Sequence, residues 1–201
     1  MHFETRFQVA GTPETVVEQF SDVPLMASFL PGASVDAQGV DGSYPATLIA
    51  AFGPKKIVFK GTLTNRVDPE SLRGTLSGKA SADVRGARMA VTMNYQLVST
   101  ETSTTHIAGG EAAPARTEVR LESDAQLTGV LAEFAKAGGV FVAEALIAEF
   151  ARRFSAYVDA TAAGRSPAPP ARNATLSMTT VAVAMLRRFR RAFLSMFSRA
   201  A

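Results

Sequence analysis

Side chains that commonly carry catalysis are few in this sequence and are not grouped. There is no cysteine, which excludes disulfides, thiolate metal sites and cysteine nucleophiles. The two histidines, His2 and His106, are far apart, and neither has metal-ligand spacing to a second histidine. The motifs GxSxG and HExxH and a phosphate-cradling glycine loop are also missing. We therefore expect a protein without catalytic residues, without a metal site and without a required cofactor.

One acidic residue, Glu149, falls near the apolar stripe of a predicted helix, where it could be a buried acid. Arg152 and Arg153 follow it by about one helical turn, a spacing at which ion pairs form readily. We expect Glu149 to pair with one of these arginines instead of acting in catalysis.

The C-terminal segment LRRFRRAFLSMFSR (186–199) combines arginines and phenylalanines without any acidic residue. On a helical wheel, apolar side chains occupy one side and arginines and serines the other, with Leu194 as the exception. Such a helix lies in a membrane interface. Its uncharged stretch before Arg187 is about a dozen residues, whereas a spanning helix needs roughly 20. The residues predicted to bind anionic membrane lipids are Met185, Leu186, Arg187, Arg188, Phe189, Arg190, Arg191, Phe193, Met196, Phe197 and Arg199.

The distribution of charge supports this prediction for the tail. Of 21 lysines and arginines, seven arginines follow Asp159, and no acidic residue does, so residues 1–160 carry −4 and the remainder +7. The tail could instead dock on its own acidic domain or bind a partner protein. Nucleic acid is the weakest alternative, because an aromatic stripe would have nothing to bury against, and we expect no nucleic-acid partner.

The elements that would position these residues follow from hydrophobic periodicity. Residues 3–9 alternate as a strand, GTPETVVEQFSD predicts a helix with Thr12 as N-cap, and VPLMASFLPG predicts a short second helix ended by Pro31. The pattern over residues 34–127 predicts an antiparallel meander that is interrupted by a polar loop at 99–114. Residues 128–160 are predicted to form one long helix. The fold class is therefore α+β, with a curved antiparallel sheet wrapped around a long C-terminal helix.

The domain boundaries follow from composition. A folded domain is expected over 1–160, a Pro/Ala-rich linker over 161–175 and the basic amphipathic helix over 176–201. The N-terminal segment lacks a basic region followed by an apolar run, so no secretory signal is visible and a cytoplasmic location is expected.

Small residues are frequent at the inward positions of the sheet and on the facing helix. They either leave an apolar cavity between these walls or allow the strands to bend and approach one another. If a cavity is present, the residues predicted to line it are Leu48, Phe52, Phe59, Gly61, Leu63, Met89, Val91, Met93, Tyr95, Leu131, Phe134, Gly138, Phe141, Val142 and Ala145.

A run of short motifs resembles the CoxG family of proteins associated with carbon monoxide dehydrogenase, within the START-like (SRPBCC) helix-grip superfamily. These motifs are LPG (30–32), GP (53–54), the F-x-G of Phe59 and Gly61, LRGTLSGKA (72–80) and GxLAxF (129–134). The resemblance covers about residues 3–158. The chain departs from it at SGKASADVRGA, where relatives are often richer in glycine, and in the length of the 99–114 loop.

The resemblance implies a helix-grip fold and a role in recruiting a molybdenum-containing carbon monoxide dehydrogenase to the membrane. It also implies a lipid-like ligand between sheet and helix. Menaquinone or another respiratory quinone is a candidate, because carbon monoxide oxidation must pass electrons to an acceptor and respiratory quinones reside in the membrane. The leading hypothesis is a non-enzymatic adaptor held peripherally at the inner face of the cell membrane by its tail. The alternatives are a lipid or quinone carrier that delivers its ligand to the dehydrogenase, and a small-molecule enzyme of the same superfamily.

Overall fold

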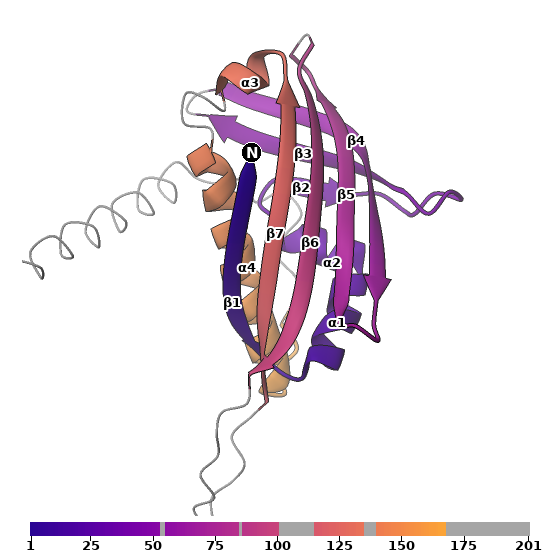
Figure 1. The fold of residues 1–201 in the computed structure, drawn as a ribbon, viewed down its shortest axis with the longest axis vertical. Coiled ribbons are helices and arrows are strands. Elements are labelled where there is room, and N and C mark those ends of the chain that lie inside the picture. The colour runs from indigo at the N-terminus through magenta and orange to yellow at the C-terminus, as the bar shows by residue number, and fades with distance from the viewer. Residues whose placement is uncertain (53–54, 85, 101–114, 135–139, 168–201) are drawn as a thin grey trace, which may run out of the picture.

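The computed structural model describes residues 1–52, 55–84, 86–100, 115–134 and 140–167. Seven antiparallel strands form one curved sheet in the order β1-β7-β6-β5-β4-β3-β2. The long helix α4 lies against the concave side, and α1 and α2 close one end (Figure 1). The strands are β1 (His2–Ala10), β2 (Ala33–Val35), β3 (Tyr44–Phe52), β4 (Lys55–Asp68), β5 (Arg73–Ala82), β6 (Arg88–Thr100) and β7 (Arg116–Thr128). The helices are α1 (Pro13–Ser21), α2 (Val23–Phe29), α3 (Val130–Phe134) and α4 (Val140–Ala162).

The strands and the first two helices confirm the sequence prediction. The Thr12 side chain accepts a hydrogen bond from the Thr15 backbone N–H at 3.4 Å, which caps α1. Helix α2 ends at Phe29, just before Pro31, as expected. The α+β helix-grip fold is therefore confirmed over the described residues, while the tail helix predicted over 176–201 lies outside them.

The single long helix predicted over 128–160 is wrong. Strand β7 continues to Thr128, which pairs with Arg88 of β6, and the chain then turns at Gly129 in a left-handed conformation with φ of 64°. A Cβ at position 129 would lie 2.5 Å from the Gly86 carbonyl oxygen, so the turn also needs glycine for space. The first helical residue after this turn is Val130, at the start of α3, and α4 extends to Ala162. Hydrogen bonding along the sheet therefore overrides the local helical periodicity at this point.

An aromatic cluster joins α4 to the sheet and to both short helices. Phe154 of α4 is fully buried, and its ring contacts those of Phe7, Phe20, Phe29 and Phe150 with centroids 5.3–6.3 Å apart. Contacts of this kind bury large apolar areas and fix the angle of the helix on the sheet. The cluster thus fills one part of the concave face and leaves the remainder to the site described next.

Candidate functional site

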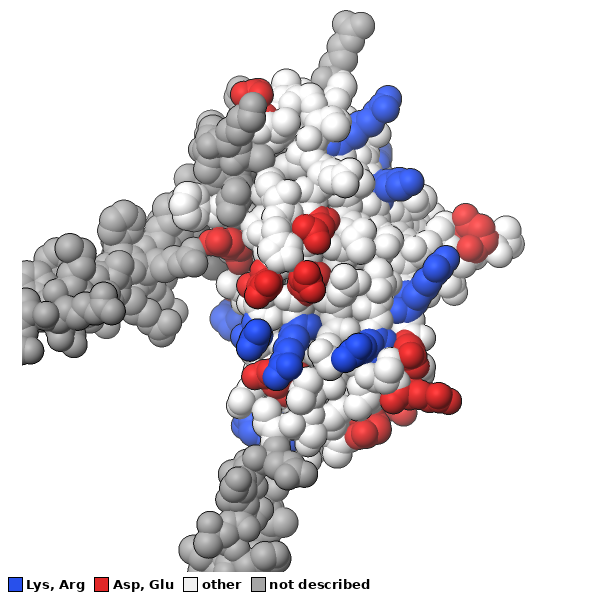
Figure 2. All heavy atoms as spheres, in the orientation of Figure 1, with Lys and Arg blue, Asp and Glu red and all other residues white. Residues whose placement is uncertain are grey.

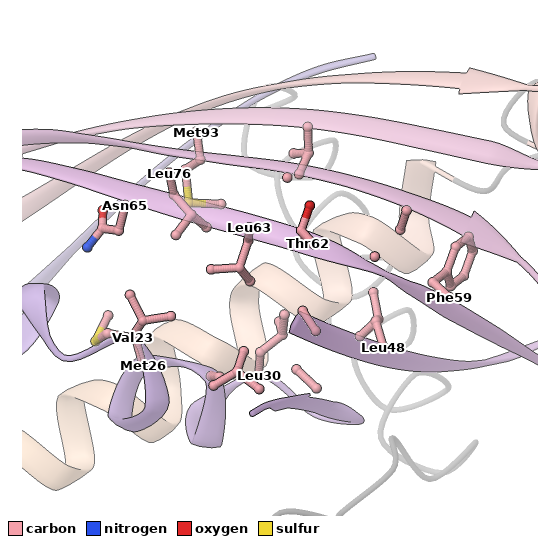
Figure 3. A pocket seen from close by; sticks show the side chains of 18 of the residues that line it. Val23, Met26, Leu30, Leu48, Phe59, Thr62, Leu63, Asn65, Leu76 and Met93 are labelled. Atoms are coloured by element: carbon pink, nitrogen blue, oxygen red, sulfur yellow. The ribbon is translucent and has the colours of Figure 1, made fainter. Parts of the chain in front are cut away.

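An apolar cavity of about 220 Å³ lies between the concave face of the sheet and the helices. Figure 3 shows Leu63 of β4 opposite Leu30, which follows α2, with Asn65 near one end and Phe59 near the other. Helix α4 contributes Ile147 and Phe150 to the wall. For comparison, an engineered apolar cavity of about 150 Å³ binds benzene, so this one has room for a larger hydrocarbon group.

The strands bring the predicted cavity residues together. Eight of them line the cavity: Leu48, Phe59, Gly61, Leu63, Met89, Val91, Met93 and Tyr95. They lie on β3, β4 and β6 at alternate positions, as residues of one sheet face must.

The four predicted helical residues whose side chains the structure describes are not among the residues that line this cavity. Leu131 is buried in a separate cluster with Ala50, Phe59 and Ala87, and Phe141 is 52% exposed. Val142 and Ala145 are half-buried and do not line the cavity. The predicted apolar stripe includes residues of both α3 and α4. Gly138 and the side chains of Phe52 and Phe134 lie outside the described part of the structure.

The glycines show that strand approach also occurs beside the cavity. A Cβ at Gly61 would lie 1.9 Å from the Lys79 carbonyl oxygen and 2.6 Å from the Ala80 Cα, so β4 and β5 need glycine there. At Gly78 the nearest atom would be Val91 Cγ1 at 3.3 Å, a contact that a small shift can relieve. Close strand packing and a cavity are therefore both present, on the same face of the sheet.

Among the polar residues of the wall that were not predicted from the sequence, Asn65 has hydrogen-bond partners on two other elements. Its Nδ2 donates to the Phe20 carbonyl oxygen at 2.8 Å, and its Oδ1 accepts from the Tyr95 hydroxyl at 3.2 Å. Burial raises the pKa of Tyr95, whose side chain is only 4% exposed, and the bond to Asn65 acts in the opposite direction. A signal was available, because Asn65 occupies the next inward position after Leu63, where the alternation expects an apolar residue.

Glu149 forms the predicted ion pairs on α4. One carboxylate oxygen accepts from Arg152 at 2.6 Å and from Arg153 at 2.7 Å, and the other accepts from Arg152 at 2.8 Å. The bonds from Arg152 and then Arg153 lower the pKa of Glu149 to about 2, against the opposing effect of burial. This carboxylate is therefore ionised at neutral pH and is held as a structural group.

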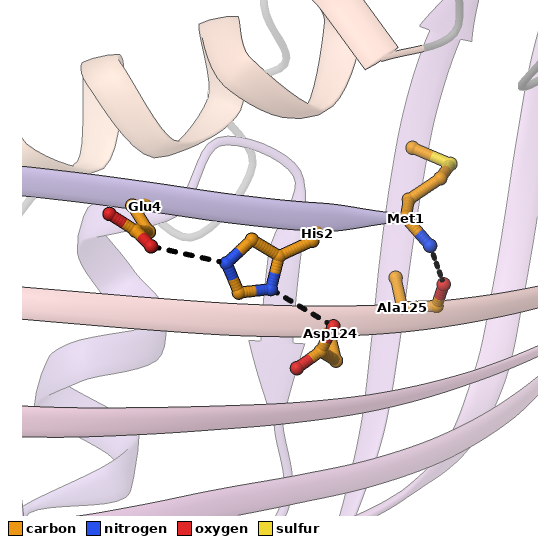
Figure 4. A network of polar contacts seen from close by, with 5 residues as sticks. All are labelled: Met1, His2, Glu4, Asp124 and Ala125. Carbon is orange, nitrogen blue, oxygen red and sulfur yellow. Dashed lines mark hydrogen bonds and ion pairs between the residues drawn. The ribbon is translucent and has the colours of Figure 1, made fainter.

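A second polar group lies on the outer face of the sheet. His2 contacts Asp124 at 3.1 Å and Glu4 at 3.3 Å, and these hydrogen bonds raise the pKa of His2 (Figure 4). Ligand atoms of His2, Glu122 and Asp124 lie within 4.8 Å of one another, and all three residues are exposed. Exposed acidic groups commonly adopt such spacing without an ion. The contacts follow from the register of β1 and β7, which pairs His2 with Asp124.

The charges on this outer face are mixed. Figure 2 shows small groups of acidic side chains beside basic ones, without one extended region of a single sign. Among the helices that the structure describes, none is long and apolar enough to cross a membrane.

Comparison with known proteins supports the fold alone. No protein-family model and no curated protein matches the sequence. A conserved protein from Geobacillus kaustophilus superposes with a TM-score of 0.61 at 16% identity, covering 82% of this chain and 96% of the other. The Zhui aromatase/cyclase from Streptomyces sp. R1128 gives a TM-score of 0.47 at 14% identity, covering 80% and 97%. The di-domain ARO/CYC StfQ of the steffimycin biosynthetic pathway gives 0.48 at 13% identity, covering 79% of this chain and 45% of that one. The likeness to the Geobacillus kaustophilus protein, at 16% identity, shows a shared fold and no shared activity.

Proposed function

We propose that this protein is a non-enzymatic binding protein whose cavity holds an uncharged, lipid-like molecule. The observation that carries the proposal is the 220 Å³ cavity between sheet and helices, lined mainly by apolar residues. Lys79 is the one charged residue along the described wall, and it is exposed. A ligand bearing a charge inside the cavity would lose its hydration without gaining a partner, which disfavours fatty-acid carboxylates and phosphates buried head-first.

The proposal extends to the membrane on the strength of the tail sequence. Arginines near an anionic leaflet contribute roughly 1 kcal/mol each, and three phenylalanines on the opposite side add apolar burial. The tail would hold the protein peripherally at the inner face of the cell membrane, where lipid-like ligands are concentrated. The resemblance to CoxG supports a partner for the folded domain, a molybdenum-containing carbon monoxide dehydrogenase, which the protein would recruit to that surface.

The alternative role is that of a carrier. In this version the protein takes a respiratory quinone, such as menaquinone, from the membrane and delivers it to the dehydrogenase. The apolar cavity favours this version, because an adaptor that only tethers its partner has no need of a ligand site. Carbon monoxide oxidation releases electrons, and a quinone is a membrane-soluble acceptor for them.

Native mass spectrometry of the purified full-length protein, followed by solvent extraction of lipids, tests the proposal. We expect a fraction of molecules to carry additional mass that is released on denaturation as an uncharged apolar compound. A ligand that exchanges when membranes are added supports the carrier, and a retained one supports the adaptor. A protein that is free of ligand, and that takes up no lipid or quinone from vesicles, would contradict the proposed function.

A further inference from the structure

The cavity has one polar end, formed by residues from three elements. Asn65 of β4 lies among Val23, Met26 and Leu76 in Figure 3, and its amide links the backbone of Phe20 to the hydroxyl of Tyr95. Phe20 lies in the last turn of α1, where helix carbonyl groups have no partner within the helix. One role of Asn65 is therefore to satisfy this carbonyl and hold α1 against the sheet.

The orientation of the Asn65 amide is fixed by its two partners. A backbone carbonyl can only accept, so the group facing Phe20 must be the NH₂. The oxygen then accepts the hydrogen of Tyr95, and this leaves the hydroxyl of Tyr95 with acceptor capacity only. The reverse placement of the amide would put two acceptors, Oδ1 and the Phe20 carbonyl, against each other.

One hydrogen-bond donor at this end of the cavity has no partner among the described residues. The NH₂ of Asn65 has two hydrogens, and the contacts of the described residues account for one of them, on the Phe20 carbonyl oxygen. Asn65 is one of the residues that line the cavity. A ligand that brings an acceptor to this amide would therefore satisfy a donor that has no other partner among the described residues.

We propose that Asn65 determines specificity by donating this second N–H to a neutral carbonyl oxygen of the ligand. The ligand would be a ketone, quinone or ester, bound carbonyl-first, with its hydrocarbon part extending along Leu63 toward Phe59 and Leu48. This inference rests on the proposed binding function and deepens it by naming the group that is recognised and the direction of entry. A carboxylate does not fit this end, because no cationic side chain is among the residues that form it.

A matched pair of probes, naphthoquinone and naphthalene, isolates the carbonyl groups on one ring skeleton. The absence of cysteine makes the quinone a usable probe, since thiol addition cannot occur. Titrations would use the full-length protein, the Asn65→Leu variant and, as a control, Asn94→Leu on the outward face of β6. Asn94 accepts a bond from Thr75 and is exposed, so it reports the general cost of replacing a sheet asparagine. We expect Asn65→Leu to lower the affinity for naphthoquinone about three- to tenfold, which is the usual contribution of one neutral hydrogen bond. The affinity for naphthalene should be unchanged or higher.

A measurement on the unmodified protein makes the test independent of how the variant folds. With ¹⁵N-labelled protein, the Asn65 side-chain amide resonance should move on addition of naphthoquinone and stay nearly still with naphthalene at equal occupancy. The inference is wrong, and Asn65 only holds α1, if Asn65→Leu weakens the binding of both probes equally. It is also wrong if both probes move the Asn65 resonance equally. If naphthoquinone is not weakened at all, it is also wrong. If neither probe binds the unmodified protein, it is the proposed binding function that fails.

Discussion

The hydroxyl of Tyr95 occupies the space in which a side chain of residue 74 would begin. A Cβ built on Gly74 would lie 2.1 Å from the Tyr95 hydroxyl oxygen and 2.7 Å from the Arg66 carbonyl oxygen. The tyrosine ring crosses from β6 over its partner position on β5, because Gly74 and Tyr95 are paired in the sheet. Because residue 74 has no side chain, the Tyr95 hydroxyl can take this position and hydrogen-bond to Asn65.

Replacing Gly74 by alanine should displace Tyr95 and break its bond to Asn65. We expect a loss of roughly 1–3 kcal/mol in the free energy of unfolding, the usual cost of overpacking, and weaker ligand binding. Urea denaturation followed by tyrosine fluorescence measures the first effect. Gly78→Ala is the matched control on the same strand, because its Cβ would meet only Val91 Cγ1 closely, at 3.3 Å. Equal losses in the two variants would show that the contact with Tyr95 is not the cause.

The Glu149 ion pairs should make stability depend on pH in the acid range. The pKa of Glu149 is lowered from 4.5 to about 2 in the folded protein, so its contribution is fully present above 4.5 and is lost as pH falls toward 2. Replacing Glu149 with glutamine should cost roughly 1–3 kcal/mol near pH 7, and the cost should shrink between pH 4.5 and pH 2. Thermal melts of both proteins across this range test this, with Glu18→Gln on the exposed side of α1 as the control. A cost that stays constant with pH would rule out an ionic origin.

Removing residues 176–201 should abolish binding to membranes while leaving the domain folded. The proposal places all of the basic interfacial surface in this segment, and the domain that remains has an excess of acidic residues. Co-sedimentation with anionic liposomes measures binding, and circular dichroism checks the fold. Undiminished co-sedimentation of the shortened protein would show that another surface is the anchor.

The two faces of the tail should respond differently to salt. Replacing Phe189, Phe193 and Phe197 with serine should prevent binding even at low salt, because the loss of apolar burial is independent of screening. Replacing Arg187, Arg188, Arg190 and Arg191 with glutamine should weaken binding and make the remainder less dependent on salt, because charge attraction is what salt screens. Liposome binding over a salt series separates the two sets. The same salt dependence in both would contradict an interfacial helix.

The sheet half of the site could be predicted from sequence, and the helical half could not. Alternation in a strand fixes which residues share a face, so the placement of Phe59, Leu63 and Val91 on the cavity wall follows without knowledge of the fold. The residues of a helix that face a cavity depend on how the helix packs, and Ile147 and Phe150 were not predicted. The apolar periodicity around Leu131 is helical, yet the break at Gly129 depends on its contact with Gly86, distant in sequence.

The polar end illustrates a different limit. The position of Asn65 can be read from the alternation of β4, but its partners come from α1 and β6 and are set only by the tertiary fold. Glu149 is the opposite case, because both of its partners lie within one helical turn and could be named from the sequence.

The central claim, that the cavity is where an apolar ligand binds, is tested most directly by filling it. Ala46 of β3 lines the cavity, and leucine at this position adds three carbon atoms to that space. The control is Ala90→Leu, which adds the same atoms on β6 between the inward residues Met89 and Val91, and so on the outward face. The measurement is native mass spectrometry of the three full-length proteins loaded side by side from the same vesicles. We predict that the unmodified protein and Ala90→Leu retain the ligand mass, and that Ala46→Leu loses it while its melting temperature is unchanged or raised. Equal ligand occupancy in a folded Ala46→Leu protein would contradict the account.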